Sequence, residues 1–168
     1  VFMPLYAPRI SIAPGEVGVI LTVSIFLMAF SQVPMGRMAD RGHALSMIMA
    51  GSVVSAASLA LIPATTTFWE LFIAAAANGL GSALILPALL AVTVKLGRGM
   101  GMGTSMGAYN TAMSLGMITA PLLGGLVMDL SSMELVFVLG GAAGVGASGV
   151  VYQLTRRSLE AVEAGGSG

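Results

Sequence analysis

The sequence predicts an all-α, multi-pass transmembrane helical bundle. Of its 168 residues, 57% are hydrophobic and only 8% are charged, and the mean hydropathy is +0.96. Soluble domains carry about 25% charged residues, so this chain lacks the polar side chains to cover a water-facing surface. Uncharged intervals such as Val17–Gly36 and Ala44–Trp69 reach the roughly 20 apolar residues that a helix needs to cross a bilayer.

Composition also excludes several classes of function. The net charge is zero, which argues against nucleic acid as a partner. There is no cysteine, so disulfide frameworks and cysteine metal sites are excluded. The only histidine, His43, has a single acid, Asp40, near it, and no metal or cofactor site is expected.

The order of the elements follows from apolar runs and breakers. Residues 1–8 resemble the last turns of a helix whose earlier part is missing, and Pro8, Pro14 and Gly15 mark the following loop. The chain begins without an initiator methionine or a basic segment, so its start is not a signal peptide. Five complete spans are predicted at residues 17–36, about 44–63, 68 to about 94, 99–128 and about 135–154.

The distribution of basic residues predicts an orientation. If the spans alternate, every lysine and arginine except Arg9 falls on one side of the membrane, while Glu16, Glu70, Asp129 and Glu134 fall on the other. Loops that carry the excess of lysine and arginine are cytoplasmic. The turn at Gly36–His43 and the C-terminus are therefore predicted to be cytoplasmic.

Small residues recur every four positions in several spans. They form four series: Gly99, Gly103 and Gly107; Gly116, Ala120 and Gly124; Ala75, Gly79 and Ala83; and Gly140, Gly144 and Ser148. In lipid, small residues at this spacing let helix backbones approach closely. These series predict tight helix packing and say nothing about activity.

Polar side chains inside the predicted spans are the main candidates for function, because a polar group in hydrocarbon is costly unless it is paired or faces water. The candidates are Ser24, Gln32, Asn78, Asn110 and Ser114. Two interpretations stand side by side: the residues line a hydrated cavity, or they hydrogen-bond between helices. No span contains a charged residue, so a proton-carrying carboxylate is not expected within these spans.

The segment Gly103–Gly107 matches the G-x-S-x-G pattern of a serine nucleophile elbow. That motif needs a strand-to-helix turn and a histidine within reach of Ser105. Here it begins a predicted membrane helix, and His43 belongs to a predicted turn. Glycine-spaced packing explains the match better, and the chain is not expected to be an enzyme.

The turn between the first two complete spans resembles a signature of the major facilitator superfamily of secondary transporters, G-x-x-x-D-R-x-G-R-R. Gly36, Asp40 and Arg41 match it, whereas His43 replaces the glycine and Ala44–Leu45 replace the basic pair. The resemblance implies that this turn is a cytoplasmic gate, whose aspartate holds the N-terminus of a neighbouring helix. A carboxylate is favourable at such a terminus.

The span 99–128 resembles a second family signature, the antiporter motif G-x(8)-G-x(3)-G-P-x(2)-G-G. The matching residues are Gly107, Gly116, Pro121, Gly124 and Gly125, with Ala120 in place of one glycine. In the family this motif marks drug/proton antiporters, and these residues are expected to bend the span and pack it closely against a neighbour. Ala75 stands where the N-terminal half of such transporters carries an arginine, so the C-terminal half is favoured.

Together the resemblances imply a transmembrane half-domain over residues 1–157, built from inverted three-helix repeats at 1–63 and 68–154, with a polar cytoplasmic tail at 158–168. The implied function is alternating-access transport of a small solute in the cell membrane (the inner membrane of a bacterium), with proton-coupled efflux of drugs or metabolites preferred. The expected partners are the lipid bilayer, the solute, protons and the missing other half. An uptake symporter or facilitator of the same superfamily and a non-transporting scaffold are the alternatives.

Overall fold

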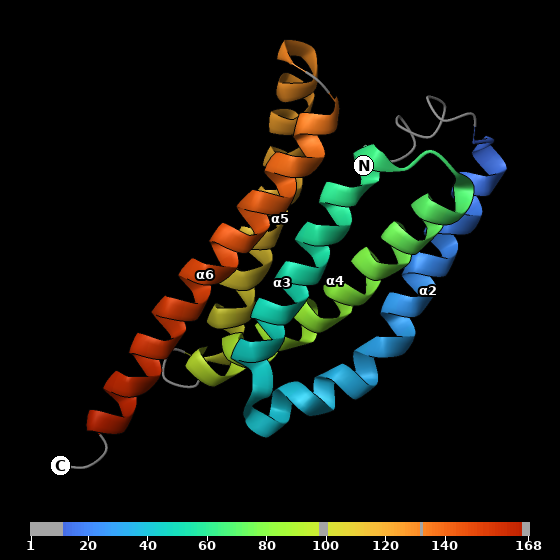
Figure 1. Cartoon of the computed structure of the whole chain (residues 1–168). Coiled ribbons are helices and arrows are strands. Elements are labelled where there is room, and N and C mark those ends of the chain that lie inside the picture. Colours follow the sequence, from blue (N-terminus) through green and yellow to red (C-terminus); the bar gives the residue numbers. More distant parts are fainter. Residues whose placement is uncertain (1–11, 98–100, 132, 166–168) are drawn as a thin grey trace.

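The structure, a computed structural model, describes residues 12–97, 101–131 and 133–165, and these form a bundle of long helices (Figure 1). The predicted end of a helix at residues 1–8 lies outside this part. The described helices are α2 (Pro14–Met38), α3 (Ala44–Leu61), α4 (Phe68–Gly97), α5 (Met102–Leu130) and α6 (Met133–Gly165), with the short turns η2 (Ala39–His43) and η3 (Ile62–Ala64). No strand occurs among the described residues, and the predicted all-α class is confirmed.

The helices are long and apolar enough to cross a membrane. Four helical runs in the described part meet that condition: Pro14–Ala64, Phe68–Lys95, Met102–Leu130 and Leu135–Arg157. The first run contains the η2 turn and therefore supplies two spans, α2 and α3. The five predicted spans are thus present. The helix α6 continues to Gly165, so the predicted polar tail is helical as far as that residue.

Successive helices run in opposite directions, which gathers the charges at two ends of the bundle (Figure 1). We call the end that carries the η2 turn the basic end; its described cations are Arg37, Arg41, Lys95, Arg156 and Arg157. The opposite end, which we call the acidic end, carries Glu16, Glu70 and Asp129. Arg98 lies outside the described residues, and nothing is described of the Glu134 side chain.

The chain reverses at Gly42, which has φ +93° and ψ 4°. This left-handed conformation favours glycine because a side chain would strain it. The family signature has its glycine one position later, where this chain has His43. Gly42 therefore supplies the reversal that lets α2 and α3 lie antiparallel, although the signature does not specify a glycine there.

Helix α4 is the centre of the packing, since it contacts both α3 and α2 extensively. At Gly81 an added Cβ would lie 2.9 Å from the Gly51 carbonyl oxygen of α3, and at Gly51 it would lie 2.7 Å from the Gly81 carbonyl oxygen. At Gly79 an added Cβ would lie 2.8 Å from the Ser24 carbonyl oxygen of α2. Any larger residue at these positions would force two backbones apart, so glycine sets the distance between these helices.

Helix α6 joins the bundle by packing on α3. A Cβ added at Gly141 would lie 3.1 Å from the Ala56 carbonyl oxygen, and the hydroxyls of Ser148 and Ser52 contact one another. Of the predicted small-residue series in this span, only Ser148 makes such a contact. Gly140 and Gly144 have nothing within 4 Å of an added Cβ.

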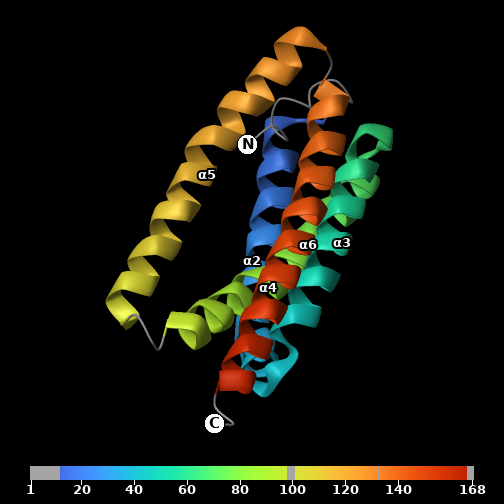
Figure 2. The same cartoon turned by 90° about the vertical axis from the view of Figure 1, so that its left-hand side faces the viewer.

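Helix α5 lies to one side of the other helices and contacts them sparsely (Figure 2). An added Cβ would meet nothing within 4 Å at Gly107, Gly116 or Gly125, and only Gly124 among the antiporter-like glycines is buried. The close packing expected of this motif is therefore absent among the described residues. The expectation failed because four-residue spacing gathers small residues on one face without placing a helix against it.

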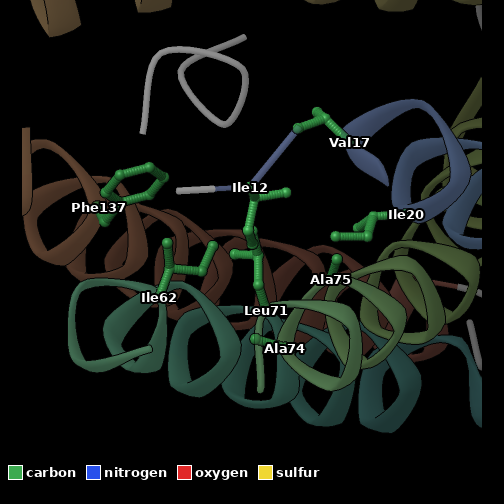
Figure 3. Packing of buried hydrophobic residues seen from close by; sticks show 8 residues of the cluster. All are labelled: Ile12, Val17, Ile20, Ile62, Leu71, Ala74, Ala75 and Phe137. Atoms are coloured by element: carbon green, nitrogen blue, oxygen red, sulfur yellow. The ribbon is translucent and has the colours of Figure 1, made fainter. Parts of the chain in front are cut away.

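Two apolar clusters close the bundle near its ends. Figure 3 shows the one at the acidic end, where residues from four helical segments converge: Ile12, Val17, Ile20, Ile62, Leu71, Ala74, Ala75 and Phe137. A second cluster near the basic end combines the η2 turn with α3 and α4 through Ala39, Ala44, Met47, Ile48 and Ala88. The turn is therefore anchored by packing as well as by its backbone conformation.

The glycine contacts predict an asymmetric response to a single methyl group. Gly81→Ala is expected to lower the free energy of unfolding by about 1–3 kcal/mol, because the added Cβ overpacks the α3–α4 contact. Gly146→Ala on α6 is the matched control, since nothing lies within 4 Å of its Cβ position, and a change within about 0.5 kcal/mol is expected. Equal thermal unfolding of the two purified variants would contradict the assigned contact.

Candidate functional site: a polar cavity beside the η2 turn

The largest polar hollow lies at the basic end between α2, α4 and α5, with a volume of about 910 Å³. Its polar lining comes from the η2 turn and from three helices: Gln32, Asp40, Lys95, Tyr109, Asn110 and Thr155. Apolar residues, among them Leu86, Pro87 and Met113, complete the wall. We call this hollow the polar cavity.

The gate-like residues lie at the edge of the polar cavity. Gly36 and Asp40 line it, and Arg41 follows Asp40 in the same turn. Asp40 and Arg41 are exposed, and neither makes a hydrogen bond or an ion pair with any residue in the described ranges. The Asp40 carboxylate is thus available to a partner across the cavity.

The wall opposite Asp40 is the first part of α5. That helix begins at Met102 after Gly101, which has φ +91°, and no side chain caps its N-terminus. The first backbone N–H groups of a helix lack carbonyl partners within the helix and carry partial positive charge. An unpaired carboxylate and an uncapped helix terminus therefore belong to facing sides of one cavity.

Two of the five predicted cavity residues line the polar cavity. Gln32 reaches it from α2 and Asn110 from α5, and both side chains are exposed without a hydrogen-bond partner in the described part of the chain. Tyr109 and Lys95 also line it, although sequence reasoning did not select them. The signal for Lys95 was its place as the charge that ends an apolar span.

Two other predicted cavity residues, Ser24 and Asn78, line a different hollow nearer the acidic end. This second hollow lies between α2, α4, α5 and α6 and has a volume of about 790 Å³. Its walls are almost entirely apolar, with side chains such as Leu21, Ile25 and Leu123. We call it the apolar groove. The fifth candidate, Ser114, is exposed on α5 and lines neither hollow.

Asn78 makes the interhelical hydrogen bonds that the sequence left as one of two options. Its Nδ2 donates to the Ser55 Oγ at 2.9 Å and approaches the Ser55 carbonyl oxygen at 3.4 Å. The Ser24 hydroxyl donates to the Ile20 carbonyl within its own helix at 2.7 Å. Asn78 thus joins α4 to α3 one turn from the Gly51–Gly81 contact, while its side chain also borders the apolar groove.

The G-x-S-x-G match has a packing explanation. Ser105 is buried in the first turn of α5 against Gly97, and its hydroxyl donates to the Gly101 carbonyl at 3.1 Å. His43 belongs to the start of α3 and is exposed. Within the described ranges no group of three or more potential metal-ligating side chains occurs.

The hydrogen bond between α3 and α4 predicts a measurable coupling. Asn78→Ala and Ser55→Ala are each expected to destabilise the protein, and the double variant should lose less than the sum. The coupling energy expected for such a pair in a membrane averages about 0.6 kcal/mol and reaches about 1.7 kcal/mol. A double-mutant cycle on thermal unfolding measures it. Asn110→Ala, which removes no described hydrogen bond, is the control, and strict additivity would exclude the coupling.

Comparison with known proteins places the chain in a family. The Major Facilitator Superfamily sequence model matches residues 1–167. An uncharacterised MFS-type transporter of Methanocaldococcus jannaschii is 23% identical over 150 residues, which cover 89% of this chain and 39% of that protein. Multidrug resistance proteins MdtG of Dickeya zeae and Proteus mirabilis are each 26% identical over 145 residues, covering 82% of this chain and 35% of each relative.

No solved structure matches the chain significantly. The chain spans less than two fifths of the length of the curated relatives that it matches. The family match covers nearly every residue, and the described helices have the length and apolar character of membrane spans. This chain belongs to the Major Facilitator Superfamily of membrane transporters.

Proposed function

We propose that the chain is the C-terminal half of a transporter that moves a small solute by alternating access, with its basic end in the cytoplasm. The polar cavity carries this proposal. It brings the gate-like residues Gly36 and Asp40 together with Gln32 and Asn110 on helices whose remaining surface is apolar. In a membrane, polar groups of this kind mark a path for water or solute.

Gln32 and Asn110 are proposed to contact the solute. Their side chains come from opposite walls, α2 and α5, and neither is used in packing among the described residues. Asn78 and Ser24 are better explained as packing residues, since one bonds to Ser55 and the other to Ile20. The solute path therefore runs between α2, α4 and the first half of α5, facing the half that this chain does not contain.

Asp40 is proposed to close the cytoplasmic side by moving against the N-terminus of α5. In the described arrangement the carboxylate is unpaired and that N-terminus is uncapped, as expected when the gate is open. Contact between them would add a charge–dipole attraction of about 0.3–2 kcal/mol. Arg41 would keep the turn at the membrane surface.

The preferred direction is proton-coupled efflux of drugs or metabolites. Two observations support it: the antiporter-like series Gly107, Gly116, Pro121, Gly124 and Gly125, and similarity to proteins named for multidrug resistance. The acid that carries the proton is proposed to lie in the other half, because the described spans contain no carboxylate at mid-depth. No catalytic role is proposed for Ser105, whose hydroxyl is occupied in packing.

Dye accumulation in cells tests this function. Cells that express the full-length protein are expected to retain less ethidium, a lipophilic cation, than cells without it, and a protonophore should abolish the difference. Higher retention would indicate uptake and overturn the efflux direction. Unchanged retention across a panel of cationic, anionic and neutral dyes would favour a scaffold over a transporter.

The gate assignment predicts a selective effect of one charge. Asp40→Asn in the full-length protein is expected to slow transport by a factor of up to about thirty, since 2 kcal/mol of state preference is lost at most. Its amount in the membrane should not change, because Asp40 is exposed and unpaired. Asp129→Asn at the acidic end is the matched control. Equal initial rates for the two variants would contradict the gate.

A further inference from the structure

The apolar groove is too apolar for a solute path and too wide to be a packing defect. Four helices, α2, α4, α5 and α6, enclose its 790 Å³. Taken as a cylinder 10–12 Å wide and 5.4 Å long per turn, roughly one to two turns of α-helix occupy this volume. No charged side chain lines the groove.

The walls of the groove contain many small residues that have no packing partner in the described bundle. Ala120 and Gly124 of α5 face it together with Gly140 and Ala143 of α6. Nothing lies within 4 Å of a Cβ built at Gly140. Small residues at a helix surface permit a second backbone to approach closely. Across the groove Ala75, Gly79 and Ser82 of α4 complete a lining in which a helix backbone fits.

The internal repeat shows which helix contact is missing. If α4–α5–α6 repeats the preceding three-helix unit, α5 corresponds to α2 and α6 to α3. Helix α4, the first of its unit, packs on both α2 and α3. By the same relation, the first helix of the preceding unit packs on α5 and α6, across the apolar groove. Without it α5 makes few contacts (Figure 2).

The start of the described chain lies at the mouth of this groove. Ile12 is only 6% exposed, in a cluster with Ile62 and Phe137, and both of those residues also line the groove (Figure 3). Residues 1–8 of the sequence contain no charge. The relatives are more than twice as long as the matched segment, so a preceding helix has the chain it needs in a longer protein.

We propose that the apolar groove is the seat of a membrane helix of the same polypeptide that ends shortly before Ile12. This proposal rests on the proposed function only in that the chain is part of a longer transporter. It assigns Ala120, Gly124, Gly140 and Ala143 to the contact with that helix and removes the groove from the solute path. It also explains why α5 stands apart from the other helices.

Cysteine cross-linking in the full-length protein tests this seat. The 168 residues contain no cysteine, and any cysteine elsewhere is replaced by serine. Leu5→Cys is paired in turn with Leu123→Cys and Leu139→Cys, which line the groove, and with their neighbours Leu122→Cys and Val138→Cys, which do not. The groove pairs are expected to cross-link within one polypeptide several-fold more than the control pairs after oxidation with copper phenanthroline.

A pair of alanines on α6 gives a second, independent test. Ala142 and Ala143 are neighbours and both are exposed in the described bundle, but only Ala143 lines the groove. In the full-length protein Ala143→Leu is expected to lower Tm by several degrees, because its side chain would collide with the seated helix. Ala142→Leu should leave Tm unchanged.

The outcomes separate this proposal from the proposed function. Cross-links between two polypeptides would show a second copy in the groove and overturn the proposal, as would groove and control pairs that react equally. Cross-linking is repeated in the Asp40→Asn background. Groove-specific cross-links there support the seat even if transport is lost, whereas normal transport without such cross-links overturns the seat and leaves the function intact.

Discussion

The bundle depends on a contact between helix backbones at the centre of α4. At Gly51 and Gly81 each helix places a carbonyl oxygen where a side chain of the other would stand, and Gly79 does the same against Ser24 of α2. Lipid offers no hydrophobic drive for helices to associate, so close van der Waals packing and hydrogen bonds must hold them together. The bond from Asn78 to Ser55 lies beside this contact and sets its register.

This arrangement divides the chain into a tightly packed part and a loosely held one. Helices α2, α3 and α4 approach through glycine, and α6 adds to them at Gly141 and Ser148. Helix α5 has neither kind of contact along most of its length, yet it forms one wall of both hollows. A wall that is not bound to the packed helices is suited to move, and the polar cavity opens on the side where such motion would alter access.

The sequence predicted the class, the five spans and the reversal near Gly36–His43, because apolar length and clustered charge are strong signals in membrane chains. It failed to predict which small residues touch. Gly140 and Gly141 are equivalent by composition, but only Gly141 faces α3. The five polar candidates were also equivalent from spacing alone. Depth and facing direction separate Gln32 and Asn110 from Asn78, and both depend on how the helices tilt and on which neighbour is present.

The central claim is that α5 moves against a rigid α2–α3–α4 unit at the basic end. Pulsed electron paramagnetic resonance on the full-length protein measures this most directly, with one spin label at His43 and one at Ala108, compared with a second pair at Val53 and Leu80. The account predicts two distances for the first pair, whose populations shift when a transported dye is added, and one constant distance for the second. A single, unchanging distance for the first pair would contradict it.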